Sequence, residues 1–79
     1  MPEHDEFTKE QLQKIGERIK ALRKAKGYTN YEHFAYDNGI NRVQYGRYEK
    51  GADLKISSLI KVLKGFDMSL TEFFAEGFE

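Results

Sequence analysis

Cysteine is absent from the 79-residue chain, which excludes disulfide bonds, thiolate metal ligands and thiol nucleophiles. Histidine occurs only twice, as His4 and His33, and the sequence has neither a glycine-rich phosphate loop nor a cluster of metal-ligand residues. We therefore expect no enzyme, no catalytic residue, no metal site and no cofactor. A chain that needs no disulfides suits the reducing cytoplasm.

Long apolar runs are also absent, so no segment is expected to span or bind a membrane. The first residues, MPEHDEF, are acidic and lack the basic and apolar regions of a signal peptide. Proline occurs once, at Pro2, and so interrupts no helix further along the chain. We predict a single cytoplasmic domain over residues 1–79, with an acidic segment at 1–8 and a tail at 75–79.

An overall excess of positive charge, common in nucleic-acid-binding domains, is missing because 13 basic residues balance 13 acidic ones. The charges are nevertheless segregated along the chain. Residues 1–11 carry a net charge of −3 and residues 56–79 carry −2, whereas residues 12–55 carry +5. The middle of the chain is therefore the part whose charge suits DNA.

Capping signals predict where the helices begin. Thr8 and Gln11 have the spacing of a capping box, and Phe7 and Leu12 that of a hydrophobic staple, so a first helix should begin near Lys9. Its apolar residues recur at intervals of three and four, which predicts one buried face. Three glycines are expected to end the first, second and third helices: Gly27, Gly39 and Gly51.

Residues 28–38 predict a short second helix, with either Thr29 or Asn30 as its N-cap. Asn41 gives a further capping signal and predicts a third helix over residues 42–50. Two short helices that meet across a glycine corner are the arrangement of a helix-turn-helix.

The last third of the chain predicts two more helices. Apolar residues at helical spacing from Ile56 predict a fourth helix that stops near Gly65. Ser69 and Glu72 predict a capped fifth helix with an apolar face made of Leu70, Phe73 and Phe74. The predicted fold is all-α, a compact bundle of five helices with the helix-turn-helix in helices 2 and 3.

The third predicted helix has two faces of different chemistry. Tyr45 and Tyr48 lie on a face suited to packing, and we expect their hydroxyls to reach the surface or a partner. The opposite face combines three cations with a small apolar residue and a glycine: Arg42, Val43, Gly46, Arg47 and Lys50. Such a face fits the major groove of double-stranded DNA.

In a major groove, arginine can bind guanine O6 and N7, and valine can contact the thymine methyl group. Arg42 and Arg47 are therefore the leading candidates to read bases, with Val43 beside them. Gln44 has two alternative roles, because its side chain can contact a base or turn back to the cap at Asn41.

Residues 15–74 resemble a known protein family. The resemblance lies in two stretches: IGERIKALRKAKGYTNYEHFAYDNGINRVQYGRYEKG and ISSLIKVLKGFDMSLTEFF. The motif elements are Arg23, Phe34, Ala35, Gly39, Arg47, Glu49 and Gly51. The chain resembles the phage repressor and Cro-like family, often called XRE. The resemblance implies a lambda-repressor-like bundle, sequence-specific DNA binding and a transcriptional regulator, by default a repressor. It also implies a largely buried structural ion pair between Arg23 and Glu49.

By the same resemblance, a phosphate contact at the start of the second helix falls on either Asn30 or Tyr31, because this segment is one residue longer than usual. Lys50 and Lys55 flank a loop that follows the DNA backbone in the family, although each could equally be a solvent-facing charge. Gly46 stands where a serine is frequent, and a close approach by DNA or by a tyrosine ring would explain it.

A homodimer is expected, since one short helix reads few bases and two half-sites improve discrimination. The resemblance places the dimer contact in the fifth helix and the segment after it, with Phe74 and Phe78 as candidates. Packing of Phe74 in the core is the alternative. The other function considered is a protein-interaction module or antitoxin-like partner that keeps the helix-turn-helix fold, which the zero net charge favours.

Overall fold

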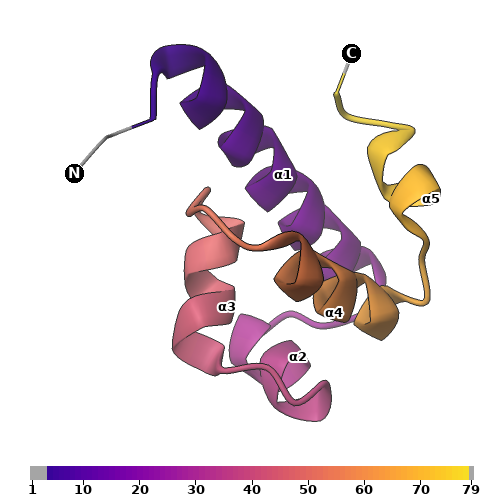
Figure 1. Ribbon diagram of the computed structural model, residues 1–79. Coiled ribbons are helices and arrows are strands. Elements are labelled where there is room, and N and C mark those ends of the chain that lie inside the picture. The colour runs from indigo at the N-terminus through magenta and orange to yellow at the C-terminus, as the bar shows by residue number, and fades with distance from the viewer. Residues whose placement is uncertain (1–3, 79) are drawn as a thin grey trace.

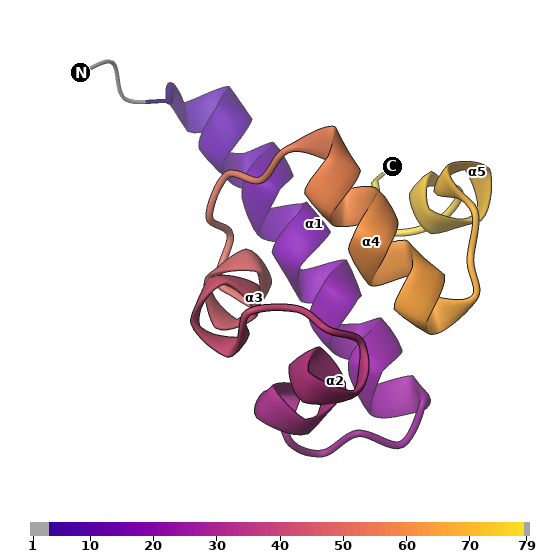
Figure 2. The same ribbon diagram turned by 60° about the horizontal axis from the view of Figure 1, so that its bottom comes forward.

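The computed structural model describes residues 4–78, in which five helices and no strand are present. The helices are α1 (Glu6–Ala25), α2 (Tyr31–Asp37), α3 (Arg42–Glu49), α4 (Ile56–Phe66) and α5 (Leu70–Phe74). Figures 1 and 2 show the long α1 crossing the molecule, with α2 and α3 on one side of it and α5 on the other. The predicted all-α fold with a helix-turn-helix is confirmed.

The predicted start of α1 is wrong, because the helix begins three residues before Lys9. Asp5 is the N-cap, and its carboxylate accepts a hydrogen bond from the backbone N–H of Thr8 at 2.8 Å. This bond lowers the pKa of Asp5. Phe7 consequently lies in the first turn with 69% of its surface exposed, so the predicted staple is absent. Residues 1–3 and 79 of the predicted terminal segments lie outside the described residues.

The N-cap alternatives of the other helices are resolved. Asn30 caps α2 by accepting from the N–H groups of Glu32 and His33, so Thr29 is not the cap. Asn41 caps α3 by accepting from the backbone N–H of Gln44. The predicted capping box at the start of α5, between Ser69 and Glu72, is confirmed in both directions.

The predicted glycine ends are confirmed at Gly27, Gly39 and Gly51, whose φ angles are all positive. Gly39 forms the corner between α2 and α3, and the N–H of Ile40 then bonds to the carbonyl of Ala35 at 2.8 Å. The prediction that α4 stops near Gly65 is confirmed, since the helix ends at Phe66 and Gly65 lies in its last turn. A Cβ there would lie 2.7 Å from the Asn38 side chain, so glycine lets α4 approach α2 closely.

The core is an aromatic and aliphatic cluster to which every helix contributes. Its buried members are Ile19, Phe34, Ala35, Tyr45, Tyr48, Leu59, Val62, Leu63, Phe66 and Phe73. Phe34 of α2 lies at its centre, with ring centroids 4.7 Å from Phe66 and 5.1 Å from Tyr45. Burial of these side chains supplies the main stabilisation, at about 1.5 to 3 kcal/mol for each large one. The core therefore fixes α2 and α3 against α4.

Arg18 attaches α5 to α1, a contact that the sequence did not reveal. Its guanidinium donates to the carbonyls of Phe73 at 2.6 Å and Glu72 at 3.2 Å, and it lies 5.6 Å from the centre of the Phe73 ring. The Glu72 carbonyl also accepts the backbone N–H of Ala75 at 3.3 Å, so Arg18 adds a second donor there and supplies one to the Phe73 carbonyl at the end of α5. No helix within residues 4–78 is long and apolar enough to cross a membrane.

Candidate nucleic-acid interface

The C-terminal end of α3 lies directly against α1 at Gly16. A Cβ at this position would be 2.5 Å from the backbone oxygen of Tyr48 and 2.8 Å from that of Glu49. Contacts this short do not occur in folded proteins, and the atoms involved are backbone, so neither helix can yield by a side-chain rotation. Gly16, which the sequence did not single out, therefore sets the distance between α1 and the end of α3.

Arg23 of α1 and Glu49 of α3 form a buried ion pair beside this contact. The Nε and Nη2 groups of Arg23 donate to the two carboxylate oxygens of Glu49 at 2.7 and 3.1 Å, and Nη1 donates to the carbonyl of Tyr28 at 2.8 Å. The two side chains are only 5% and 7% exposed. The hydrogen bonds to Glu49 raise the pKa of Arg23. Two parallel bonds from a guanidinium to a carboxylate fix orientation as well as distance.

The tyrosine face of α3 packs inward, with Tyr45 fully buried and Tyr48 9% exposed. The expectation that the Tyr45 hydroxyl reaches the surface or a partner is wrong. Within residues 4–78 this hydroxyl forms no hydrogen bond, although it lies beside the Arg23–Glu49 pair. Burial, and then the neighbouring Glu49 carboxylate, raise the pKa of Tyr45 far above its usual range. The ring of Tyr45 therefore packs in the core, and its hydroxyl adds no hydrogen bond there.

The opposite face of α3 is open to solvent. The side chains predicted to read bases are all exposed on α3: Arg42, Val43, Gln44 and Arg47. Lys50, at the C-cap, is exposed as well. In Figures 1 and 2, α3 lies on the opposite side of α1 from α5, at the edge of the molecule, and neither α4 nor α5 covers it. The helix therefore presents its cationic face without obstruction.

Arg42 has a neighbour that the sequence did not indicate. Its Nη1 atom lies 3.7 Å from a carboxylate oxygen of Glu32 on α2, and the two side chains are 70% and 47% exposed. An exposed pair at this distance contributes about 0 to 1 kcal/mol, since water solvates both partners. The contact orients Arg42 loosely across the turn.

Gly46 of α3 faces the ring of Tyr31 on α2. A Cβ on Gly46 would lie 2.8 Å from a ring carbon of Tyr31, so the glycine admits the ring against the helix. Of the two explanations offered for this glycine, the tyrosine ring is the one present. Tyr31 remains 38% exposed, next to Asn30, whose side-chain oxygen is used by the α2 cap.

A hollow of about 370 Å³ separates the exposed end of α3 from the loop that leads to α4. Gln44 and Arg47 line it on the helix side, and Asp53, Lys55 and Ser58 line it on the other. The structure thus brings Lys55 and the acidic Asp53 to the same surface as Arg47. Asp53 is in turn contacted by His4, which precedes α1, at 3.2 Å.

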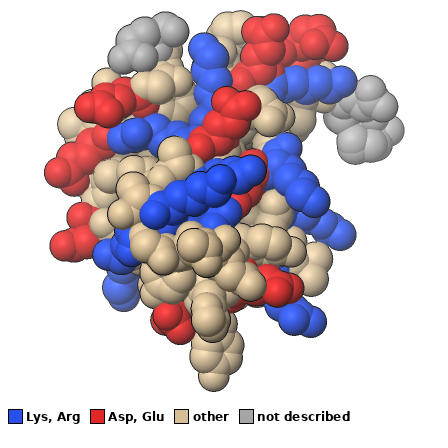
Figure 3. All heavy atoms as spheres, turned by 180° about the vertical axis from the view of Figure 1, so that it is seen from behind, with Lys and Arg blue, Asp and Glu red and all other residues tan. Residues whose placement is uncertain are grey.

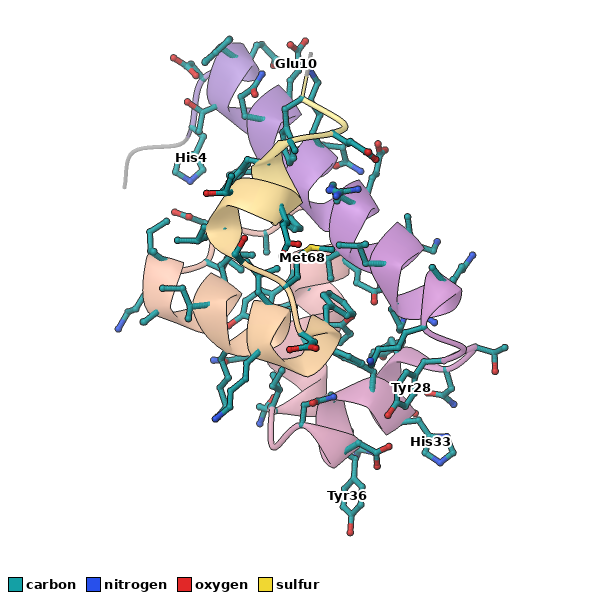
Figure 4. The ribbon with its side chains drawn as sticks, turned by 90° about the vertical axis from the view of Figure 1, so that its right-hand side faces the viewer. His4, Glu10, Tyr28, His33, Tyr36 and Met68 are labelled. Carbon is teal, nitrogen blue, oxygen red and sulfur yellow. The ribbon has the colours of Figure 1, made fainter. Side chains whose placement is uncertain are left out.

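One face of the molecule, the back of the view in Figure 1, has mixed charge. Seen from behind in Figure 3, basic and acidic side chains alternate, and neither sign of charge dominates. The two histidines lie at opposite ends of the molecule (Figure 4), and no group of metal-ligating side chains is found in the described part of the chain.

The candidate dimer residues lie on the other side of the molecule from α3. Phe74 is 42% exposed, so the alternative that packs it in the core is wrong. Phe78 is half-buried, and its ring centroid lies 5.0 Å from that of Phe74 and 5.8 Å from that of Phe73. The two candidates thus form one aromatic cluster, in which Phe74 is the more exposed.

Comparison with known proteins agrees with this arrangement. The sequence model of the helix-turn-helix family matches residues 19–73. Among solved structures, the chain is similar to the restriction-modification controller protein C.AhdI from Aeromonas hydrophila, with a TM-score of 0.74 and 30% sequence identity over 82% of this chain and 98% of that one. No curated protein matches. The chain belongs to the helix-turn-helix family of the phage repressor and Cro-like (XRE) type, and is a DNA-binding regulator of transcription, not an enzyme.

Proposed function

We propose that the chain binds double-stranded DNA sequence-specifically by placing α3 in the major groove. The observation that carries the proposal is the division of α3 into a buried tyrosine face and an exposed cationic face. Arg42 and Arg47 bind guanine edges, Val43 contacts a thymine methyl group, and Gln44, which lines the hollow with Arg47, binds an adenine edge.

The DNA backbone is contacted around this helix. Lys50 and Lys55 bind phosphates as point charges, and Asn30 and Tyr31 donate hydrogen bonds from the start of α2. All four side chains are exposed and lie on or beside the helix-turn-helix. Gly46 acts indirectly, since it seats the Tyr31 ring and does not itself need to approach the backbone.

The proposed active species is a homodimer that contacts two half-sites about one DNA turn apart. Three exposed apolar side chains on α4 and α5 support an interface away from α3: Ile60 at 48%, Leu70 at 39% and Phe74 at 42% exposure. Arg18 positions α5, and therefore Phe74, relative to α1. Bound to DNA in the cytoplasm, such a dimer represses transcription wherever its site overlaps that of the polymerase.

The likeness to a controller protein favours a specific class of target. The match covers 98% of that solved chain and 82% of this one, at 30% sequence identity. We therefore propose restriction-modification genes as the first candidates for regulation.

Selection of duplexes from a random DNA pool tests the proposal, with wild type, Arg42→Ala and Lys20→Ala run in parallel. Lys20 is an exposed cation on α1 and controls for the loss of one positive charge. We expect wild type and Lys20→Ala to enrich the same two-fold symmetric site, and Arg42→Ala to lose or relax one position of it. A bidentate contact to a base contributes about 1 to 3 kcal/mol to discrimination.

Absence of any enrichment by wild type would contradict sequence-specific binding and favour a protein partner, such as a toxin. The dimer has its own test in light scattering of wild type and Phe74→Glu. The variant should be monomeric at concentrations where wild type is dimeric. A wild-type monomer at concentrations that bind DNA would contradict the dimer.

A further inference from the structure

We propose that His4 is a proton-linked residue of the DNA interface that acts by neutralising Asp53. The proposal rests on the proposed function, because it adds a residue to the same DNA-facing loop. His4 and Asp53 are 49 positions apart, yet Nε2 of His4 lies 3.2 Å from a carboxylate oxygen of Asp53. Figure 4 shows the imidazole of His4 pointing from the start of α1 toward the N-terminal end of α4.

Asp53 is unfavourably placed for DNA binding. It lines the same hollow as Gln44 and Arg47, and its side chain is 64% exposed. A carboxylate at this position repels DNA phosphates and offsets the attraction of Lys55 on the same wall. Any group that cancels this charge therefore favours binding.

His4 can cancel the charge, because a protonated imidazole is a cation and Nε2 of His4 lies 3.2 Å from the Asp53 carboxylate. Neutral His4 leaves the contact with one negative charge, whereas protonated His4 makes it neutral. The other charged groups nearby are Asp5 in the same segment, Arg47 on α3 and Lys55 in the loop. Phosphates approaching this surface favour the protonated imidazole, so DNA binding takes up a proton and strengthens as the pH falls.

The test is the dissociation constant for DNA at about pH 6 and about pH 7.5, measured by fluorescence anisotropy at constant ionic strength. The probes are the duplex enriched by selection and a mixed-sequence duplex of the same length. For wild type we expect binding about 3- to 10-fold tighter at the lower pH, the range for uptake of up to one proton.

Three variants identify the group responsible. His4→Gln should lose most of the pH dependence, whereas His33→Gln, which removes the other histidine at the far end of the molecule, should keep it. Asp53→Asn should bind DNA more tightly than wild type at the higher pH. The ratio of its dissociation constants at the two pH values should be smaller than that of wild type. The α-amino group is present in every variant and cancels from the comparison.

An unchanged pH ratio in His4→Gln, its loss in His33→Gln, or no gain in affinity for Asp53→Asn would overturn the inference. No pH dependence in wild type would overturn it as well, while leaving DNA binding intact. Failure of wild type to bind either duplex at both pH values would contradict the proposed function itself.

Discussion

Two arginine–glutamate contacts join α3 to neighbouring helices, and they differ in distance and burial. Arg23 and Glu49 lie 2.7 Å apart with 5% and 7% of their side chains exposed. Arg42 and Glu32 lie 3.7 Å apart with 70% and 47% exposed. A buried charge that loses its partner costs several kcal/mol, whereas an exposed pair contributes about 0 to 1 kcal/mol. The same two residue types therefore have different consequences at the two ends of one helix.

The difference between the two pairs explains how α3 is held firmly against α1 while its outer side chains stay exposed to solvent. Its C-terminal end is held by Gly16 against the backbone and by the Arg23–Glu49 pair. Near its N-terminal end, Arg42 can exchange a carboxylate for a guanine or a phosphate at little cost, because water already surrounds it. The buried pair thus positions the helix, and the exposed pair leaves Arg42, the side chain proposed to read a base, open to solvent.

The largest expected effect is that of Glu49→Gln, which leaves the Arg23 guanidinium buried without an opposite charge. The free energy of unfolding, measured by urea titration and circular dichroism, should fall by about 3 to 5 kcal/mol. Replacing both partners, as in Arg23→Met with Glu49→Leu, should restore much of it. A Glu49→Gln protein as stable as wild type would remove the distinction between the two pairs.

Gly16→Ala should have the next largest effect on the free energy of unfolding. Whether it lowers or raises that free energy shows whether α1 and α3 are in close contact. Helix propensity alone would stabilise α1 by about 1 kcal/mol. The new Cβ would instead lie 2.5 Å from the Tyr48 backbone oxygen, so we expect destabilisation of about 1 to 3 kcal/mol. Thermal unfolding distinguishes the two. An increase in stability would mean that α1 and α3 are not held in close contact.

Tyr45→Phe tests whether the buried pair depends on the neighbouring hydroxyl. The hydroxyl is buried without a hydrogen bond, so its removal should leave stability unchanged or raise it by about 1 kcal/mol. The same urea titration provides the measurement. A loss of more than about 1 kcal/mol would show that the hydroxyl supports Glu49.

Glu32→Gln should have the smallest effect on stability and a visible one on DNA affinity. Loss of the exposed pair should change the free energy of unfolding by no more than about 0.5 kcal/mol. Affinity should rise by about two- to threefold, because a negative charge beside Arg42 is removed. In an Arg42→Ala background most of this gain should disappear. Weaker DNA binding by Glu32→Gln would mean that Glu32 positions Arg42 for binding.

Local signals in the sequence predicted most of the fold. The glycine ends at Gly27, Gly39 and Gly51 depend on a single backbone conformation, and the box at Ser69 on neighbouring residues, so all were found. The start of α1 was missed because Asp5 and Thr8 both suit an N-cap, and the carboxylate is the one that accepts the bond.

The local patterns of the sequence did not predict the contacts between residues that are distant in sequence. Arg18 and Gly16 have partners on other helices and belong to no local pattern. The Arg23–Glu49 contact was anticipated only through the family resemblance, and the pairing of Arg42 with Glu32 was not anticipated. The exposed face of α3 could be predicted from the sequence because helical periodicity alone separates it from the tyrosine face.

The central claim, that α3 reads bases in the major groove, is tested most directly with modified DNA. The dissociation constant is measured for the selected duplex before and after its purines are replaced by 7-deazapurines, which lack the N7 acceptor of the major groove and leave the minor groove unchanged. The account predicts that wild-type affinity falls about tenfold or more, and that Arg42→Ala shows no further loss at the guanine it no longer contacts. Equal affinity of wild type for the two duplexes would contradict it.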